Sequence, residues 1–347
     1  MPERSVEEAL VGTVLRAVSG FYDVQPDHPE ALPPLDGADP ADEPSPLVRC
    51  RLRERLRKEL VLTESKARPQ RVREVRRLSV VEPVVAGDRV QFRLAPTSGT
   101  AIREGVIEAV LPRRRELTRQ AVTDGSVPVG QTLVANLDQV LLVFAAAEPS
   151  PALGLVDRFL VSCEWAELPA ILVINKCDLD IDPQLAADLA VYERIGYRVL
   201  RASARRGDGL AELRDVVRGV TSAFVGPSGV GKSSLLNALE PGLGLRVGEV
   251  SAATGKGRHT TRFAQLIPLR EGGFVADTPG LRQLALWAVP ADELDRQFRE
   301  FRPYLERCRF GNCAHVDDEG CAVREAVDRG EIDRRRYLSY VKLFTEG

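Results

Sequence analysis

Gly226-Pro-Ser-Gly-Val-Gly-Lys-Ser233 is the stretch on which the interpretation of this 347-residue sequence depends. It follows Thr221–Val225, an apolar run with the length of a buried strand, and it precedes Ser234–Leu239, which reads as the start of a helix. In the order strand, glycine loop, helix, the pattern GxxxxGK[ST] predicts a phosphate-binding loop. The glycines let successive backbone N–H groups converge on an anion, and the helix N-terminus adds the positive end of its dipole.

The alternative for this stretch is a glycine-rich turn without a ligand, which leaves the flanking strand and helix unexplained. In the phosphate-loop interpretation, Lys232 reaches the β- and γ-phosphates and the Ser233 hydroxyl ligates Mg²⁺. The residues expected to bind phosphate are Gly226, Pro227, Ser228, Gly229, Val230, Gly231, Lys232, Ser233 and Ser234.

At 347 residues the chain is long enough for two or three domains. Its composition, with 44% hydrophobic and 28% charged residues, is that of a soluble globular protein. No apolar run approaches the roughly 18 residues that span a bilayer, and the acidic start lacks the order of a signal peptide. We therefore expect a cytoplasmic protein. The six cysteines do not suggest disulfides, and Cys50, Cys163 and Cys177 are expected to serve packing only.

The net charge of −2 hides a strong asymmetry near the N-terminus. Residues 23–47 carry seven acids and no Lys or Arg, whereas residues 49–80 carry twelve Lys or Arg against four acids. The arginines of 49–77 and 113–119 can neutralise nucleic-acid phosphates, and the alternative is a solvated charged face. Aromatic residues are few here (Phe21, Tyr22 and Phe92), which favours folded RNA over a single strand.

Short strands are expected in this first part of the chain, separated by Gly and Pro turns. They predict an all-β barrel of the OB type over residues 1–120, with an acidic, proline-rich insertion at 25–46. In the strand at 47–53, Val48, Cys50 and Leu52 alternate with arginines and should share the buried face. The strands are expected at 10–17, 47–53, 87–94 and 104–111.

From residue 138 onward, apolar strands alternate with helical segments, which predicts a mostly parallel α/β sheet covered on both faces. Ligands of such sheets bind at the carboxyl ends of the strands. The expected strands are 139–146, 170–174, 197–202, 221–225 and 273–276, and the expected helices are 152–167, 182–195 and 210–218.

Asn175-Lys-Cys-Asp178 closes one of these strands and predicts a guanine site. A carboxylate at Asp178 can accept hydrogen bonds from both N1–H and the 2-amino group of guanine, a pairing that adenine does not offer. The stem of Lys176 can cover the base, and Asn175 can tie this loop to the phosphate loop. Ser203-Ala204 ends the next strand, where a backbone N–H near Ala204 can meet the guanine O6.

Asp277-Thr-Pro-Gly280 follows another strand and predicts a switch that senses the γ-phosphate. Asp277 can hold Mg²⁺ and the N–H of Gly280 can reach the γ-phosphate. The polar stretch 254–261, which comes earlier in the chain, has the composition of a first switch, in which either Thr260 or Thr261 ligates the metal. Asp277–Gly280 is then the second switch.

The order of the motifs is itself informative. The base motifs precede the phosphate loop and the switches follow it, whereas an ordinary GTPase begins with its phosphate loop. We therefore expect a circularly permuted P-loop GTPase domain over residues 121–287, a rearrangement that is physically easy where domain termini lie close together.

Cys308, Cys313, His315 and Cys321 lie within a short stretch near the end of the chain. Three thiolates and one imidazole at this spacing suit a closed, structural Zn²⁺ site, and the alternative is buried cysteines beside an incidental histidine. The flanks 294–307 and 332–344 are expected to be helical, giving a small helical zinc-binding domain at 288–347.

The whole series of motifs resembles the RsgA (YjeQ) family of ribosome small-subunit-dependent GTPases, with matches at 175–178, 226–233, 257–261, 277–280 and the four zinc ligands. The resemblance implies a protein that binds the small ribosomal subunit late in its maturation, hydrolyses GTP when stimulated by it, and then leaves. It also implies that the barrel and the zinc domain contact ribosomal RNA.

One position bears on the chemistry. Leu281 follows the second switch where many GTPases place a glutamine that orients the attacking water, so another group must act. His259, in the first switch, is the candidate that both its position and the resemblance suggest. The alternative is an exposed loop histidine without a catalytic part.

Three classes of function therefore stand against one another. The first is an RNA-stimulated GTPase of small-subunit assembly, acting as a monomer. The second is a nucleotide-gated rRNA-binding module in which hydrolysis is incidental, and the third is a metabolic P-loop kinase. The guanine motif and the switches argue against the kinase.

Overall fold

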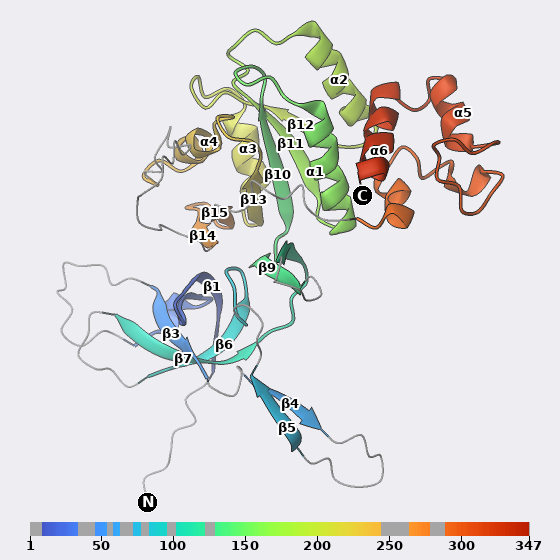
Figure 1. Cartoon of the computed structure of the whole chain (residues 1–347). Coiled ribbons are helices and arrows are strands. Elements are labelled where there is room, and N and C mark those ends of the chain that lie inside the picture. The colour runs from blue at the N-terminus through green and yellow to red at the C-terminus, as the bar shows by residue number, and fades with distance from the viewer. Residues whose placement is uncertain are drawn as a thin grey trace, which may run out of the picture. The chain divides into compact units, whose positions relative to one another are not determined.

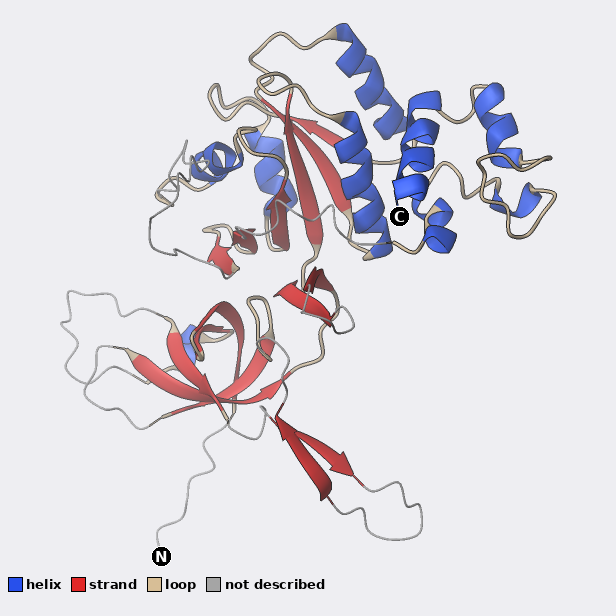
Figure 2. Ribbon diagram, in the orientation of Figure 1, coloured by secondary structure: helices blue, strands red, loops and turns tan. Residues whose placement is uncertain are grey.

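The computed structural model describes residues 9–33, 46–53, 58–62, 72–77, 83–95, 102–121, 129–243, 264–277 and 289–346. The chain divides into two compact units, which are described separately here (Figures 1 and 2). The first comprises Met1–Asn136 with Thr261–Ile267, and the second comprises Leu137–Thr260 with Pro268–Gly347. Within these described ranges, no helix is long and apolar enough to cross a membrane.

A five-stranded β-barrel forms the centre of the first unit. Its strands close in the order β1-β2-β3-β7-β6 and back to β1, and every pair is antiparallel except β3 with β7. The prediction of a small N-terminal barrel is therefore confirmed. The strands are β1 (Leu10–Val18), β2 (Phe21–Pro26), β3 (Val48–Leu52), β6 (Arg89–Leu94) and β7 (Arg103–Val110).

The barrel core follows the alternation of the strands. Val48, Cys50 and Leu52 are buried while Arg49 and Arg51 between them are exposed, as the sequence predicts. Tyr22 and Phe92 join the same apolar cluster. Burial on alternate positions is what places the β3 arginines together on the solvent face.

The start of the expected insertion at 25–46 is wrong, because the strand β2 continues to Pro26. Burial alternates along β2, with Tyr22, Val24 and Pro26 buried. The alternation of a strand was therefore present in the sequence, but the Asp- and Pro-rich composition obscured it. A 3₁₀ turn follows at Pro29–Ala31. Residues 34–45 of the expected insertion lie outside the described residues.

Besides β2, two hairpins and one further strand were not predicted. The hairpins are β4 (Lys58–Leu62) with β5 (Val72–Arg77), inserted between β3 and β6, and β8 (Glu116–Ala121) with β9 (Val129–Ala135). The strand is β14 (Gln265–Pro268), whose Gln265 pairs with Arg16 of β1.

A five-stranded parallel sheet forms the second unit, in the order β12-β11-β10-β13-β15. The chain runs outward from β10 to β12 and returns on the other side of β10, so the order reverses between β10 and β13. The strands are β10 (Gln139–Ala145), β11 (Ala170–Asn175), β12 (Arg198–Arg201), β13 (Thr221–Val225) and β15 (Phe274–Asp277).

Helices cover both faces of this sheet, as the sequence predicts (Figure 2). Leu213 of α3 and Leu235 of α4 pack in one cluster with Val143 and Val173, whereas Phe159 of α1 meets Phe144 across the other face. Every residue of β11 is buried, as expected of a central parallel strand. The helices are α1 (Leu153–Trp165), α2 (Pro183–Arg194), α3 (Leu210–Val217) and α4 (Lys232–Leu239).

The C-terminal part contains α5 (Ala322–Asp328) and α6 (Arg334–Glu346). The expected helix over 294–307 is wrong: the segment forms 3₁₀ turns at Asp295–Gln297 and Leu305–Arg307 instead. Phe298 has an extended backbone between the turns, and Pro303 disfavours a helical residue before it. This path buries Phe298 and Phe301 completely, in one cluster with Tyr340 of α6.

Candidate nucleotide and metal sites

The phosphate loop joins β13 to α4, as the sequence predicts, and two of its glycines are required by contacts. Gly231 has φ of 91°, and a Cβ there would lie 2.3 Å from Asn175 Nδ2. A Cβ at Gly226 would lie 2.0 Å from the carbonyl oxygen of Val143, which is backbone of β10 and cannot move aside. Both positions therefore need glycine for close approach as well as for conformation.

The polar groups of this loop fit an anion. Lys232 Nζ donates to the carbonyl oxygens of Gly226 and Pro227, at 2.8 and 2.6 Å, so its ammonium is held against the loop. Ser228 Oγ is buried and has no hydrogen-bond partner in the described structure. A buried hydroxyl without a partner is costly, and a phosphate oxygen would satisfy it.

Asp178 is held in place by the following strand. Ser203, which is fully buried, donates from Oγ to Asp178 Oδ1 at 2.6 Å. This hydrogen bond lowers the pKa of Asp178, so the carboxylate stays ionised. An ionised and oriented carboxylate is what acceptance of two guanine N–H groups requires.

Asn175 joins three loops through one buried amide. Its Nδ2 donates to the carbonyl oxygen of Val230 at 2.8 Å, and its Oδ1 accepts from the backbone N–H of Ala204 at 3.2 Å. The predicted link between the base motif and the phosphate loop is thus present. The Ala204 N–H, expected to meet the guanine O6, donates to Asn175 in this structure.

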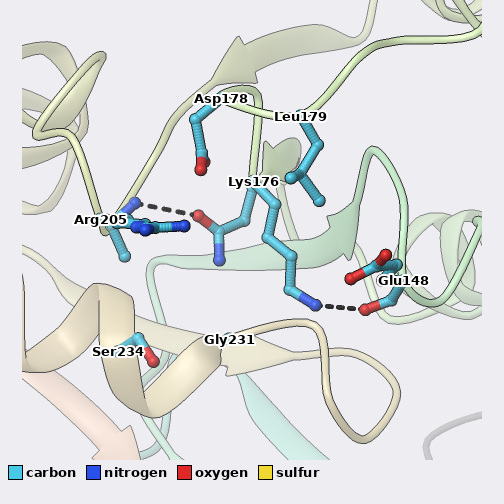
Figure 3. A pocket seen from close by; sticks show the side chains of 9 residues that line it. Glu148, Lys176, Asp178, Leu179, Arg205, Gly231 and Ser234 are labelled. Carbon is cyan, nitrogen blue, oxygen red and sulfur yellow. Dashed lines mark hydrogen bonds between the residues drawn. The ribbon is translucent and has the colours of Figure 1, made fainter.

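A pocket of about 370 Å³ lies where these loops meet, at the carboxyl ends of β10, β11 and β12 (Figure 3). This is the crevice in which open parallel sheets bind ligands. In Figure 3, Asp178 lies between Arg205 and Leu179, and Lys176 Nζ donates to the carbonyl oxygen of Glu148. The lining residues are Glu148, Asn175, Lys176, Asp178, Leu179, Ala204, Arg205, Gly231 and Ser234.

Three of these lining residues were not predicted: Glu148, Leu179 and Arg205. Each lies one or two residues after a predicted strand or motif. That proximity in sequence was the only indication that these residues could line the site. Lys176 has φ of 60°, and this left-handed conformation directs its chain across the pocket toward Glu148.

The predicted switch residues are only partly placed. Asp277 ends β15, one position beyond the Ala223–Ala276 pair, so its backbone lies beside the end of the strand that leads into the phosphate loop. His259, Thr260, Thr261, Gly280 and Leu281 lie outside the described residues.

The four predicted zinc ligands do converge. The ligand atoms of Cys308, Cys313, His315 and Cys321 all lie within 4.8 Å of one another. His315 Nδ1 is 3.6 Å from Cys308 Sγ and 3.4 Å from Cys321 Sγ. Tetrahedral Zn²⁺ with ordinary bond lengths separates a nitrogen ligand from a sulfur ligand by about 3.6 Å. The donor set and its spacing therefore fit a four-coordinate metal ion.

The histidine is also supported in the manner of a metal ligand. Its second ring nitrogen, Nε2, lies 3.2 Å from Asp295 Oδ2, and its carbonyl oxygen accepts from Tyr337 OH at 2.9 Å. A carboxylate on the far nitrogen fixes the ring so that Nδ1 faces the ligand centre. His315 and Cys321 are buried, whereas Cys308 and Cys313 are partly exposed.

Two carboxylates of α1 attach this C-terminal part to the sheet domain. Asp157, fully buried, accepts from Arg336 Nη1 at 2.7 Å and from Arg335 Nη1 at 3.0 Å. About two turns along the helix, Glu164 accepts from Arg299 Nε and Arg302 Nη2, both at 2.7 Å. These pairs were not predicted, because their partners are distant along the chain.

Comparisons with known proteins agree with this geometry. A sequence profile described as RsgA GTPase matches residues 110–287. The small ribosomal subunit biogenesis GTPase RsgA of Moorella thermoacetica is 40% identical over 97% of both chains. The protein of the same name from Gemmatimonas aurantiaca is 52% identical over 69% of this chain and 78% of its own.

Solved structures show the same architecture. The crystal structure of YjeQ from Thermotoga maritima aligns over 98% of both chains, with a TM-score of 0.71 and 33% identity. That of YloQ, described as a circularly permuted GTPase, covers 100% of this chain and 97% of its own, with a TM-score of 0.66 and 30% identity.

The fold and the pocket thus define a circularly permuted GTPase, in which the guanine-motif strand β11 precedes the phosphate-loop strand β13. The prediction of a permuted GTP hydrolase is confirmed. The chain belongs to the RsgA GTPase family of ribosome biogenesis.

Proposed function

We propose that this protein binds the small ribosomal subunit late in its maturation, hydrolyses GTP to GDP and phosphate when the subunit stimulates it, and is then released. The printed names of its relatives support the subunit as partner. The observation that carries the proposal is the pocket in which Asn175 joins the base motif to the phosphate loop.

In this pocket, Asp178 accepts the N1–H and 2-amino hydrogens of guanine, and the stem of Lys176 lies along the base. The loop 226–234 surrounds the phosphates, and Ser228 Oγ gains its missing partner there. A Mg²⁺ ion of the kind GTPases use neutralises phosphate charge, and Ser233, Thr261 (or Thr260) and Asp277 would hold it.

Hydrolysis needs a group that positions the attacking water. The side chain of Leu281 has no polar atom, so another residue must supply this group. We assign this role to His259, which is supported by its place in the first switch. We further propose that the N–H of Gly280 donates to the γ-phosphate. The subunit acts by ordering the switch, so hydrolysis without it is slow.

The metal held by Cys308, Cys313, His315 and Cys321 is one Zn²⁺ with a structural part, because protein ligands fill all four positions. The barrel is of the OB type, supported by its five strands, and contacts ribosomal RNA together with the zinc segment. The same proposal includes three domains, at residues 1–120, 121–287 and 288–347. It also includes a monomeric state and a cytoplasmic location.

GTP turnover measured against increasing small subunits tests the proposal. A rise that saturates supports it. The second candidate, a nucleotide-gated RNA-binding module, is favoured by Leu281, and it predicts nucleotide-dependent binding without any rise in turnover.

A further inference from the structure

A row of four solvent-facing residues crosses the barrel on adjacent strands. Phe21 of β2 is paired with Arg51 of β3, Arg51 with Val106 of β7, and Val106 with Arg93 of β6. Phe21 is 39% exposed and Val106 is 37% exposed, which is unusual for apolar side chains of this size. Neighbouring strands lie about 4.8 Å apart, so Phe21 and Val106 present an apolar surface about 10 Å wide with an arginine between them.

The arginines two positions before and after Arg51, Arg49 in β3 and Arg53 directly after it, each donate to a carboxylate. Arg49 Nε donates to Asp23 at 3.2 Å, and Arg53 Nη1 donates to Glu108 at 2.9 Å. Arg93, at the end of the row, also donates to Glu108, at 3.1 Å. Arg51 has no carboxylate partner among the described residues, and its guanidinium lies over the Phe21 ring, 5.0 Å from the centroid.

This arrangement prepares Arg51 for a ligand. A planar guanidinium backed by a ring keeps its outer face and its N–H donors available while losing little freedom on binding. The other aromatic residues of β2 and β6, Tyr22 and Phe92, are fully buried in the barrel core. Phe21 comes one position before Tyr22 in β2 and is exposed where Tyr22 is buried, so it lies on the outer face of the strand.

The charge of Arg51, which has no carboxylate partner among the described residues, favours an anionic ligand. In sequence, β3 lies at the start of the basic stretch 49–80, which carries twelve Lys or Arg against four acids. An anionic chain with flat, apolar faces matches a cation set between two apolar side chains. A folded duplex presents its phosphates but keeps its base faces stacked, so it cannot use Phe21.

We propose that Phe21, Arg51 and Val106 form a stacking platform for an unpaired nucleotide of RNA. This proposal rests on the RNA contact in the proposed function and assigns that contact to this surface of the barrel. The base lies against the Arg51 guanidinium and the Phe21 ring, and Val106 contacts the sugar or the next base. This departs from the expectation, drawn from the scarcity of aromatic residues, that folded RNA is favoured over a single strand.

The test measures binding of the full chain to a fluorescent single-stranded oligoribonucleotide and to the blunt duplex of the same sequence. Phe21→Ala should weaken single-strand binding about 5- to 150-fold, the range of one lost base stack, with little change for the duplex. Phe21→Trp should retain binding. Arg51→Gln should weaken it much more than Arg49→Gln, which removes the same charge from a paired arginine. Thermal melting checks that each variant is folded.

Three results would overturn the proposal: wild-type affinity in Phe21→Ala, equal losses in Arg51→Gln and Arg49→Gln, or equal losses for strand and duplex. Weaker binding to the small subunit with unchanged oligonucleotide binding would place a protein on this surface and would also overturn it. The oligonucleotide assay contains no subunits, so its outcome is separate from failure of subunit-stimulated turnover.

Discussion

Asn175 Nδ2 donates to the carbonyl oxygen of Val230 at 2.8 Å, so one buried side chain at the end of β11 holds the phosphate loop in register with the base motif. The same amide accepts from the Ala204 N–H at 3.2 Å. The base motif and the phosphate loop are therefore joined directly, although they are separated in sequence by about fifty residues.

Asn175→Ala should loosen this arrangement. The carbonyl of Val230 and the N–H of Ala204 would lose their partner, at a cost of about 1–3 kcal/mol in stability. GDP affinity should fall by about tenfold or more, because both halves of the pocket lose their alignment. Titration with a fluorescent GDP derivative and urea unfolding measure the two effects. Asn312→Ala, an exposed asparagine, is the control and should change neither. Equal behaviour of the two variants would show that the link has no such role.

Asp178→Asn should reverse the base preference. The amide NH₂ of asparagine would face the 2-amino group of guanine, donor against donor, and GDP should bind about 10- to 100-fold more weakly. Xanthine carries a carbonyl at that position, which the same NH₂ can donate to, so xanthosine diphosphate should bind better than GDP. Competition titrations with both nucleotides give the comparison. A variant that still prefers GDP would remove Asp178 from the base site.

Arg336→Ala should destabilise the protein strongly. Arg336 is fully buried, and its loss leaves Asp157 and Glu300 as buried carboxylates with fewer partners, at a cost of about 3–5 kcal/mol. The control is Arg198→Ala, which breaks an exposed pair with Glu212 and should cost about 1 kcal/mol or less. Urea unfolding measures both. Similar values for the two variants would mean that α1 and α6 are held together by apolar packing alone.

Removal of the metal should unfold the C-terminal part but spare the nucleotide pocket. The pocket residues come from β11, α4 and the loops that follow β10, β11, β12 and β13, none of which carries a cysteine or histidine ligand of the cluster. We expect one Zn²⁺ per chain in the wild type, none in Cys313→Ser, and a lower melting temperature with GDP binding retained. Metal analysis by mass spectrometry and thermal melting are the measurements. Cys163→Ala, at a buried cysteine outside the cluster, should retain the metal. A metal-free wild type would refute the site.

Local patterns were sufficient to predict most of this structure. The apolar strands and the glycine loop from Gln139 to Leu239 follow from short-range periodicity, and the zinc ligands from their spacing. The helix expected over 294–307 failed because burial of Phe298 and Phe301 determined the path, and burial is a tertiary effect. β2 was missed because Asp and Pro dominate the composition around its alternating Tyr22 and Val24.

The contacts that join distant segments could not be predicted. Asp157 and Glu164 read as ordinary polar residues of a surface helix, yet each meets two arginines from the C-terminal part. Likewise, the Asp178–Ser203 hydrogen bond depends on how β11 and β12 are paired, which a single sequence does not specify.

The central claim, that hydrolysis depends on the small ribosomal subunit and on His259, is tested most directly by GTP turnover against increasing subunits for the wild type and His259→Ala. We expect the wild-type rate to rise and saturate, while His259→Ala binds GTP with unchanged affinity but shows little or no rise. A wild-type rate that ignores the subunit would contradict the proposed function. A full rise in His259→Ala would contradict the assignment of the water-positioning residue.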